Sequence, residues 1–216
     1  MNITKAHQRY KNAKGEDVPG TTSVLSILAK PALIYWSWDL GMKGIDYRKV
    51  SDKAKDVGTL AHYLIECDIK GIKPDTSEYS KVVIDKAENA FLAWLDWKKE
   101  LGEIETVASE EQITCDTFGG TLDWVIKKVD DYILVDFKTS KGFYFEMPIQ
   151  VSAYKYLWNF AHPDKKIKFE FLLRIGKEDA EFEPRKLGDL DKEFKLFMSL
   201  LDVYNLKKEI EGKMKL

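Results

Sequence analysis

The stretch TLDWVIKKVDDYILVDFK, residues 121–138, decides the fold that the sequence predicts. It contains two runs, TLDWVIKK and YILVDFK, whose β-branched and aromatic residues are typical of strands. Three residues, Val129, Asp130 and Asp131, separate the runs, so we expect an antiparallel hairpin with a short turn.

The length of that turn decides which acids meet. Side chains alternate along a strand, so Asp136 and Lys138 share one face and Phe137 points to the other. A turn at 129–130 places Asp123 opposite Asp136, whereas a turn at 130–131 places it opposite Lys138 and diagonal to Asp136. A three-residue loop would place Asp123 opposite Phe137, on the wrong face. Two of these three registers therefore gather two carboxylates and an ammonium group on one face.

Such a group of charges points to metal chemistry. Two neighbouring carboxylates repel each other unless a cation bridges them or one is protonated. Their oxygens suit Mg²⁺, with Mn²⁺ as the alternative ion, and both ions also accept phosphate oxygens. A lysine beside them can orient a water or stabilise developing charge. The other interpretation is a surface ion pair between Asp136 and Lys138 on an edge strand, which would contribute little.

Composition limits the class of protein. The 216 residues, 44% of them hydrophobic, suffice for one domain with a real core. No stretch approaches the roughly 18 apolar residues of a membrane helix, and the polar N-terminus lacks the apolar segment of a signal peptide. Cys67 and Cys115 are expected as reduced thiols of a cytoplasmic protein. The net charge of −2 argues against a uniformly basic surface but allows a local basic groove.

The rest of the chain divides near Gly102 into a helical front and a sheet-forming part. The front begins with a loop or small hairpin, and helices are then expected over 21–30, 32–41, 51–69 and 77–101. Thr21, Thr22 or Ser23 is expected to cap the first of these helices, and Pro31 interrupts it and could start the second. The second part is expected to form strands over 106–116, 121–128, 132–138, 167–175 and 180–186, and helices over 148–161 and 187–212. This order predicts a mixed α/β fold with a central sheet.

Motifs along the chain resemble one family. GTLDWV and VDFKTS, followed by QVSAY and preceded by GTLAH, resemble the PD-(D/E)XK nuclease superfamily, specifically its RecB-like exonuclease branch. The resemblance spans about residues 58–156, and VPGTTSVLSIL is more loosely similar to phage-encoded and mitochondrial genome maintenance exonuclease-like members. It implies a restriction-endonuclease-like core, a mixed β-sheet flanked by helices. Residues 1–101 would be a helical region packed on a nuclease core of 102–216, together one compact domain.

The resemblance also assigns roles to residues. His62, Asp123, Asp136 and the Phe137 carbonyl would hold the metal, with Lys138 as the catalytic lysine. Gln150 and Tyr154, one turn apart on a helix, would support the site and contact DNA. A lone His62 is otherwise most often a satisfied helix histidine, and Gln150 and Tyr154 could belong to an ordinary amphipathic helix.

Two further acids are candidates for the surroundings of the metal. Glu66 lies one turn after His62 and could reach the site or form a salt bridge. Glu110 matches an acidic position of the family, although its neighbour Glu111 makes the choice ambiguous and a solvated surface acid is the more common case.

Aromatic and basic residues could contact nucleic acid. Trp36 and Trp38, near Tyr35, could stack on the bases of a single strand, or pack in the core. Being two apart, they cannot both face one side of a helix, so at least one is expected to be exposed. Lys141 and Arg174 are further phosphate candidates.

The predicted function is therefore metal-assisted hydrolysis of DNA, more from an end than internally, in the cytoplasm (of the host, if the chain is phage-encoded). The DNA would have a free end or be single-stranded, with recombination or repair proteins as partners and no membrane. Two cysteines exclude the family's four-cysteine iron–sulfur cluster, and no G-x-x-x-x-G-K-[ST] loop supports ATP-driven unwinding. The alternatives are a catalytically silent nucleic-acid-binding module of the same fold and an unrelated metabolic enzyme with a metal-carboxylate site.

Overall fold

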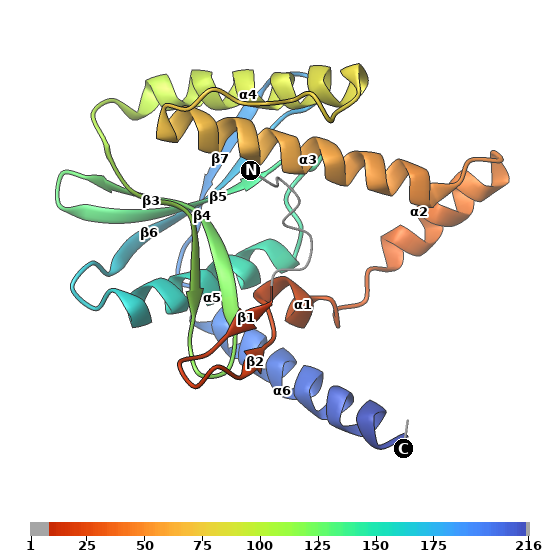
Figure 1. The fold of residues 1–216 in the computed structure, drawn as a ribbon, viewed down its shortest axis with the longest axis vertical. Coiled ribbons are helices and arrows are strands. Elements are labelled where there is room, and N and C mark those ends of the chain that lie inside the picture. The colour runs from red at the N-terminus through yellow and green to blue at the C-terminus, as the bar shows by residue number, and fades with distance from the viewer. Residues whose placement is uncertain (1–8, 215–216) are drawn as a thin grey trace.

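A computed structural model describes residues 9–214 and shows a five-stranded mixed sheet between two layers of helices (Figure 1). The strands follow one another across the sheet in chain order, with β5 and β6 as the parallel pair: β3 (Glu105–Thr114), β4 (Gly119–Lys128), β5 (Asp131–Lys138), β6 (Ile167–Ile175) and β7 (Phe182–Lys186). Helix α5 (Glu146–Ala161) makes the crossover that a parallel pair requires. The predicted mixed α/β fold with helices around a central sheet is confirmed.

The hairpin of β4 and β5 has the first of the registers considered, with a two-residue turn at 129–130. Lys128 pairs with Asp131, and the ladder continues to Trp124 opposite Val135. The turn therefore consists of Val129 and Asp130, and Val129 adopts the left-handed conformation with φ 58°. A left-handed residue is what a tight hairpin turn requires, although a β-branched side chain there is unusual.

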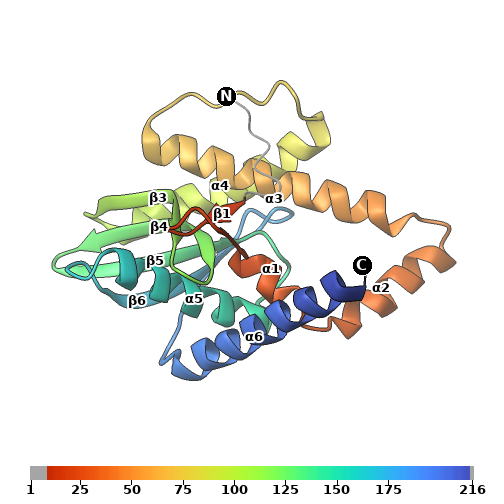
Figure 2. The same ribbon diagram turned by 60° about the horizontal axis from the view of Figure 1, so that its bottom comes forward.

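Helices cover the two faces of the sheet with separate hydrophobic cores. Helices α3 (Tyr47–Lys70) and α4 (Lys81–Leu101) pack on one face, where Trp94 meets both Trp124 and Phe137 edge to face. On the other face lie α1 (Thr21–Leu25), α5 and α6 (Asp191–Met214), as Figure 2 shows.

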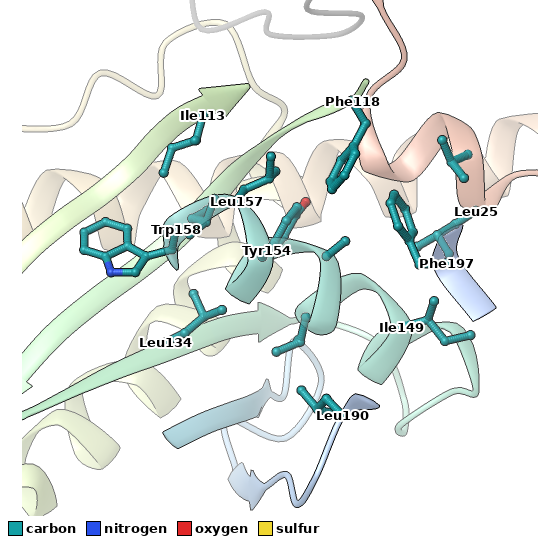
Figure 3. Packing of buried hydrophobic residues seen from close by; sticks show 14 of the residues in the cluster. Leu25, Ile113, Phe118, Leu134, Ile149, Tyr154, Leu157, Trp158, Leu190 and Phe197 are labelled. Atoms are coloured by element: carbon teal, nitrogen blue, oxygen red, sulfur yellow. The ribbon is translucent and has the colours of Figure 1, made fainter. Parts of the chain in front are cut away.

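The second core packs α5 between the sheet and α6. Leu157 and Trp158 of α5 are fully buried, and Leu134 of β5 faces them in Figure 3. Phe197 of α6 completes this core against Phe118, with ring centroids 4.7 Å apart. The core fixes α5 over the strand that ends in Asp136 and Lys138.

The N-terminal part forms a small hairpin and two helices before α3. The hairpin pairs β1 (Tyr10–Lys11) with β2 (Asp17–Val18). Helix α2 (Pro31–Met42) follows α1, begins at the interrupting Pro31, and has no buried residue among its 12. It projects from the body of the protein in both ribbon views.

Several boundaries differ from those predicted. Gly20 is the N-cap residue of α1, and no side chain caps this helix, so Thr21, Thr22 and Ser23 are not caps. The Thr21 hydroxyl instead donates to the Gly119 carbonyl at 2.9 Å. Helix α3 starts before residue 51, because the Asp46 side chain accepts a hydrogen bond from the Arg48 N–H. Over residues 9–214, no helix is both long and apolar enough to cross a membrane.

Candidate metal centre

Three acids lie in a row across the neighbouring strands β3, β4 and β5. The β4–β5 ladder runs to Trp124 opposite Val135, so its continuation places Asp123 opposite Asp136. The β3–β4 register pairs the residues on either side of Glu110 with those on either side of Asp123, so these two acids are also opposite. Glu110 has φ 53°, a strained conformation for a strand residue. Strain of this kind is common where backbone geometry serves a site.

His62 of α3 completes a group of possible metal ligands with two of these acids. Its Nδ1 lies 3.5 Å from Asp123 Oδ1 and 3.7 Å from Glu110 Oε1. One ligand atom from each of these three residues lies within 4.8 Å of the other two. One imidazole and two carboxylates form a donor set that divalent ions accept.

Asp123 is held in place by the strand beside it. Its Oδ2 accepts a hydrogen bond from the backbone N–H of Phe137 at 2.7 Å. The Phe137 ring lies on the other face, 5.8 Å from the His62 ring between centroids. Phe137 thus positions two ligands, and the role of its carbonyl as a ligand stays a prediction.

Asp136 forms a buried pair with Lys138. Its Oδ2 lies 2.6 Å from Lys138 Nζ, and its side chain is 1% exposed. Within residues 9–214, its Oδ1 is buried and receives no hydrogen bond. Burial raises the pKa of Asp136 to about 6, an effect that Lys138 opposes and Asp123 reinforces. A carboxylate oxygen buried without a donor is costly, and a cation would compensate it.

The charges around His62 favour its protonated form when no metal is bound. Burial alone would lower the pKa of the imidazole, but Asp123 and Glu110 outweigh burial and raise it to about 10. Burial would raise the pKa of Asp123, whereas His62 and Lys138 lower it below its usual value. A proton on His62 therefore supplies the positive charge that the two acids attract.

A hydrogen-bonded chain links Lys138 to α5. Lys138 Nζ donates to Gln150 Oε1 at 3.1 Å, and Gln150 Nε2 donates to the Tyr154 hydroxyl at 2.8 Å. Burial, reinforced by Asp136 and Asp123, raises the pKa of Tyr154 well above its usual value. Gly120 makes room for the Tyr154 ring, since a Cβ there would lie 2.6 Å from it. Gln150 and Tyr154 are thus bonded in series to Lys138, and their role in supporting a site and contacting DNA stays a prediction.

Some predicted site residues lie elsewhere. Glu66 forms a salt bridge with Lys70 on its own helix and does not belong to the metal-ligand group. Arg174 is 14% exposed and held by Glu183 at 3.5 Å and Asp179 at 3.7 Å, so it is not a free phosphate contact.

Glu110 corrects the expectation of a solvated surface acid. Its side chain is 17% exposed and faces His62. Glu111 turns away and lies 3.2 Å from His162 Nε2. The ambiguity between the two neighbouring acids is therefore settled by the geometry of β3.

The remaining candidates are surface residues. Lys141 is exposed, three residues beyond Lys138. Trp36 is 37% exposed and Trp38 66%, so the interpretation of both as core residues is wrong. Because α2 has no buried residue, both rings are accessible from solvent.

Sequence reasoning missed the part that the N-terminal hairpin plays. The Tyr10 hydroxyl lies 2.9 Å from Thr121 Oγ1, two residues before Asp123. Gly119 N donates to Pro19 O at 3.0 Å, so the chain after the hairpin is bonded to the start of β4. At Gly119 a Cβ atom would lie 2.7 Å from the Tyr10 ring, so a larger residue would collide with the ring. The GG pair at 119–120 is therefore one feature of the sequence that could have indicated this contact.

A groove of about 530 Å³ opens beside Lys138. One wall is formed by α1 and the start of α2, and the other by the first turns of α5. Its lining is mixed: Thr22, Leu25, Ser26, Leu28, Lys30, Leu33, Lys138, Glu146, Met147 and Gln150.

Comparisons with known proteins add little to this geometry. No protein-family model matches the chain, and no curated protein matches it either. Among solved structures, the crystal structure of SSO0001 matches with 18% identity and a TM-score of 0.36, over 69% of this chain and 74% of that chain. A TM-score this low carries no argument about function.

Proposed function

We propose that the chain is a metal-dependent deoxyribonuclease of the RecB-like branch of the PD-(D/E)XK superfamily, acting on DNA ends. The observation that carries the proposal is the row of Glu110, Asp123 and Asp136 across three strands, joined by His62 from α3 and Lys138 at the end of β5. A structural role alone does not explain this cluster, because it leaves a buried carboxylate oxygen unpaired among like charges.

The donor set fits Mg²⁺ or Mn²⁺. His62, Glu110 and Asp123 would hold the ion, with the unpaired Asp136 oxygen and the Phe137 carbonyl as the further ligands expected from the family. When bound, the ion supplies a water of lowered pKa and positive charge at the phosphate. The imidazole nitrogen favours Mn²⁺ over Mg²⁺ in affinity.

Protein side chains would orient the reacting groups. Lys138 is fixed between Asp136 and Gln150, at 2.6 and 3.1 Å, and its ammonium group can hold an attacking water or a phosphate oxygen. Tyr154 fixes Gln150, so α5 sets the direction of the lysine. Lys141 and the exposed Trp36 and Trp38 would contact DNA outside the reacting centre.

Cleavage of end-labelled DNA tests the proposal. Linear and covalently closed circular DNA are incubated with Mg²⁺, Mn²⁺ or EDTA, with wild type, Lys138→Ala and the control Lys168→Ala. Lys168 pairs with Asp131 at the other end of β5, so its loss should leave cleavage intact. We expect metal-dependent loss of the linear substrate in wild type and control, and none in Lys138→Ala.

Other results would revise the proposal. Cutting of the circle would keep a nuclease but remove the preference for ends. Equal cleavage by Lys138→Ala and wild type would contradict the assigned site. No cleavage of either DNA, with salt-sensitive binding retained, would favour the silent binding module.

A further inference from the structure

The groove beside Lys138 combines the two surfaces that a nucleotide chain needs. The partly exposed Leu28 and the exposed Leu33 give it apolar surface that a base can contact. Lys30 and Lys138 give it positive charge for phosphates. Since Lys138 lies beside the carboxylates, a strand in the groove would run directly to the candidate metal centre.

An ion pair spans the two walls of this groove. Lys30, just before α2, contacts Glu146 in the first turn of α5. The side chains are 44% and 23% exposed, so the pair is partly solvated and inexpensive to break. A phosphate entering the groove can take the place of Glu146 as the partner of Lys30.

We propose that this groove binds a single strand of DNA next to the cleaved phosphate, and that a backbone phosphate takes Lys30 from Glu146. The inference rests on the proposed nuclease function and adds to it the path of the strand and the ion pair of Lys30 and Glu146, which opens when the strand binds. A volume of about 530 Å³ corresponds to roughly one or two nucleotides.

The surface beyond the groove agrees with a single strand. The groove wall reaches Leu33 in the first turn of α2. From there α2 presents Tyr35 and Trp38, which are 74% and 66% exposed. Proteins bind unpaired bases with exposed rings placed near lysines that can contact phosphates, and here the rings of α2 follow a groove that contains Lys30 and Lys138.

Binding of a fluorescent oligothymidine tests this path without cleavage. All proteins carry Asp136→Asn and contain Mg²⁺, so that the strand stays intact. Lys30→Ala and Glu146→Gln are compared with Lys168→Ala and Asp131→Asn, a matched exposed ion pair at the far end of the sheet. Circular dichroism melts check that each variant folds.

Opposite effects are expected from the two halves of the pair. Lys30→Ala should weaken binding about fivefold and reduce the salt dependence by about one phosphate contact. Glu146→Gln should tighten binding about twofold, because it frees Lys30 and removes a negative charge from the groove. Neither control should change the Kd appreciably.

Three results would overturn the inference. The first is a Lys30→Ala variant that binds like Lys168→Ala. The second is weaker binding in Glu146→Gln, which would mean that the pair supports the groove. The third is a blunt duplex that binds as tightly as the single strand and with the same dependence on Lys30. DNA cleavage by the wild type is measured separately. If the wild type cleaves DNA but Lys30→Ala binds the strand normally, only the proposed groove is rejected. If binding depends on Lys30 but the wild type does not cleave, the nuclease function is rejected.

Discussion

The Asp123 carboxylate accepts a hydrogen bond of 2.7 Å from the backbone N–H of Phe137. This bond lies just beyond Trp124 and Val135, the last residues paired at this end of the β4–β5 ladder. A side chain thus takes over a hydrogen bond of the sheet. One oxygen of Asp123 is fixed in this way, and the other faces His62 at 3.5 Å. The strand pairing and the ligand geometry therefore depend on the same carboxylate.

Metal affinity should depend on Glu110 and not on Glu111. Glu110→Gln removes a charged ligand beside His62 and Asp123, so we expect Mn²⁺ binding to weaken about tenfold or more. Glu111→Gln is the matched control, because Glu111 faces His162. Isothermal titration calorimetry measures both, and equal affinities would contradict the assignment.

Removing Lys138 should make the free energy of unfolding depend more strongly on pH. The pKa of Asp136 is already raised from 3.8 to about 6 by burial, and loss of Lys138 would raise it further. In EDTA, Lys138→Met should lose stability relative to wild type as the pH rises from about 6 to its own higher Asp136 pKa, because its native state holds the Asp136 proton more tightly. Urea unfolding at several pH values measures this, with Lys168→Met as the control. A destabilisation that is constant with pH would contradict the prediction.

His62 should stabilise the metal-free protein most at low pH. The pKa of His62 is raised from 6.5 to about 10 in the native state, chiefly because Asp123 outweighs burial. In EDTA, its contribution should be complete below about pH 6.5 and lost as the pH rises through about 10. The difference in unfolding free energy between wild type and His62→Gln should therefore shrink with rising pH. With Mn²⁺ the trend should reverse, because the metal binds the neutral imidazole.

The turn at Val129 should be open to improvement. Val129 is 86% exposed and has φ 58°, a conformation that costs a β-branched residue about 1–2 kcal/mol. Val129→Gly should raise the free energy of unfolding by about 1 kcal/mol, since glycine adopts this conformation freely. Val82→Gly, in α4, should lower it. Urea denaturation of both variants and of wild type measures these changes. A Val129→Gly variant less stable than wild type would contradict the turn geometry.

Short-range pattern predicted the sheet and much of the site. The alternation around Asp136 and Lys138 and the short connection at Val129 limited the register to a few choices, one of which the structure has. Glu110 could not be chosen over Glu111, because a register shift between Thr106 and Ala108 decides which acid faces His62.

Contacts between distant segments could not be predicted. The exposure of Trp36 and Trp38 follows from the position of α2, none of whose residues 31–42 is buried, and composition does not reveal that position. The contact of Tyr10 with Thr121 joins residues 111 positions apart, and no local pattern announces such a contact.

The N-terminal hairpin has a practical consequence for handling the protein. The start of β4 is bonded to the N-terminal segment: Thr121 contacts Tyr10, and Gly119 contacts Pro19 and Thr21. None of these three N-terminal residues is a candidate ligand. Limited proteolysis that trims the chain to Gly20 would leave every candidate ligand and Lys138 chemically intact. It would remove the contacts of Tyr10 and Pro19 with the start of the strand that carries Asp123. An affinity tag is therefore better placed at the C-terminus. The mass of a preparation that has lost activity should first be measured by mass spectrometry, to see whether an N-terminal fragment is missing.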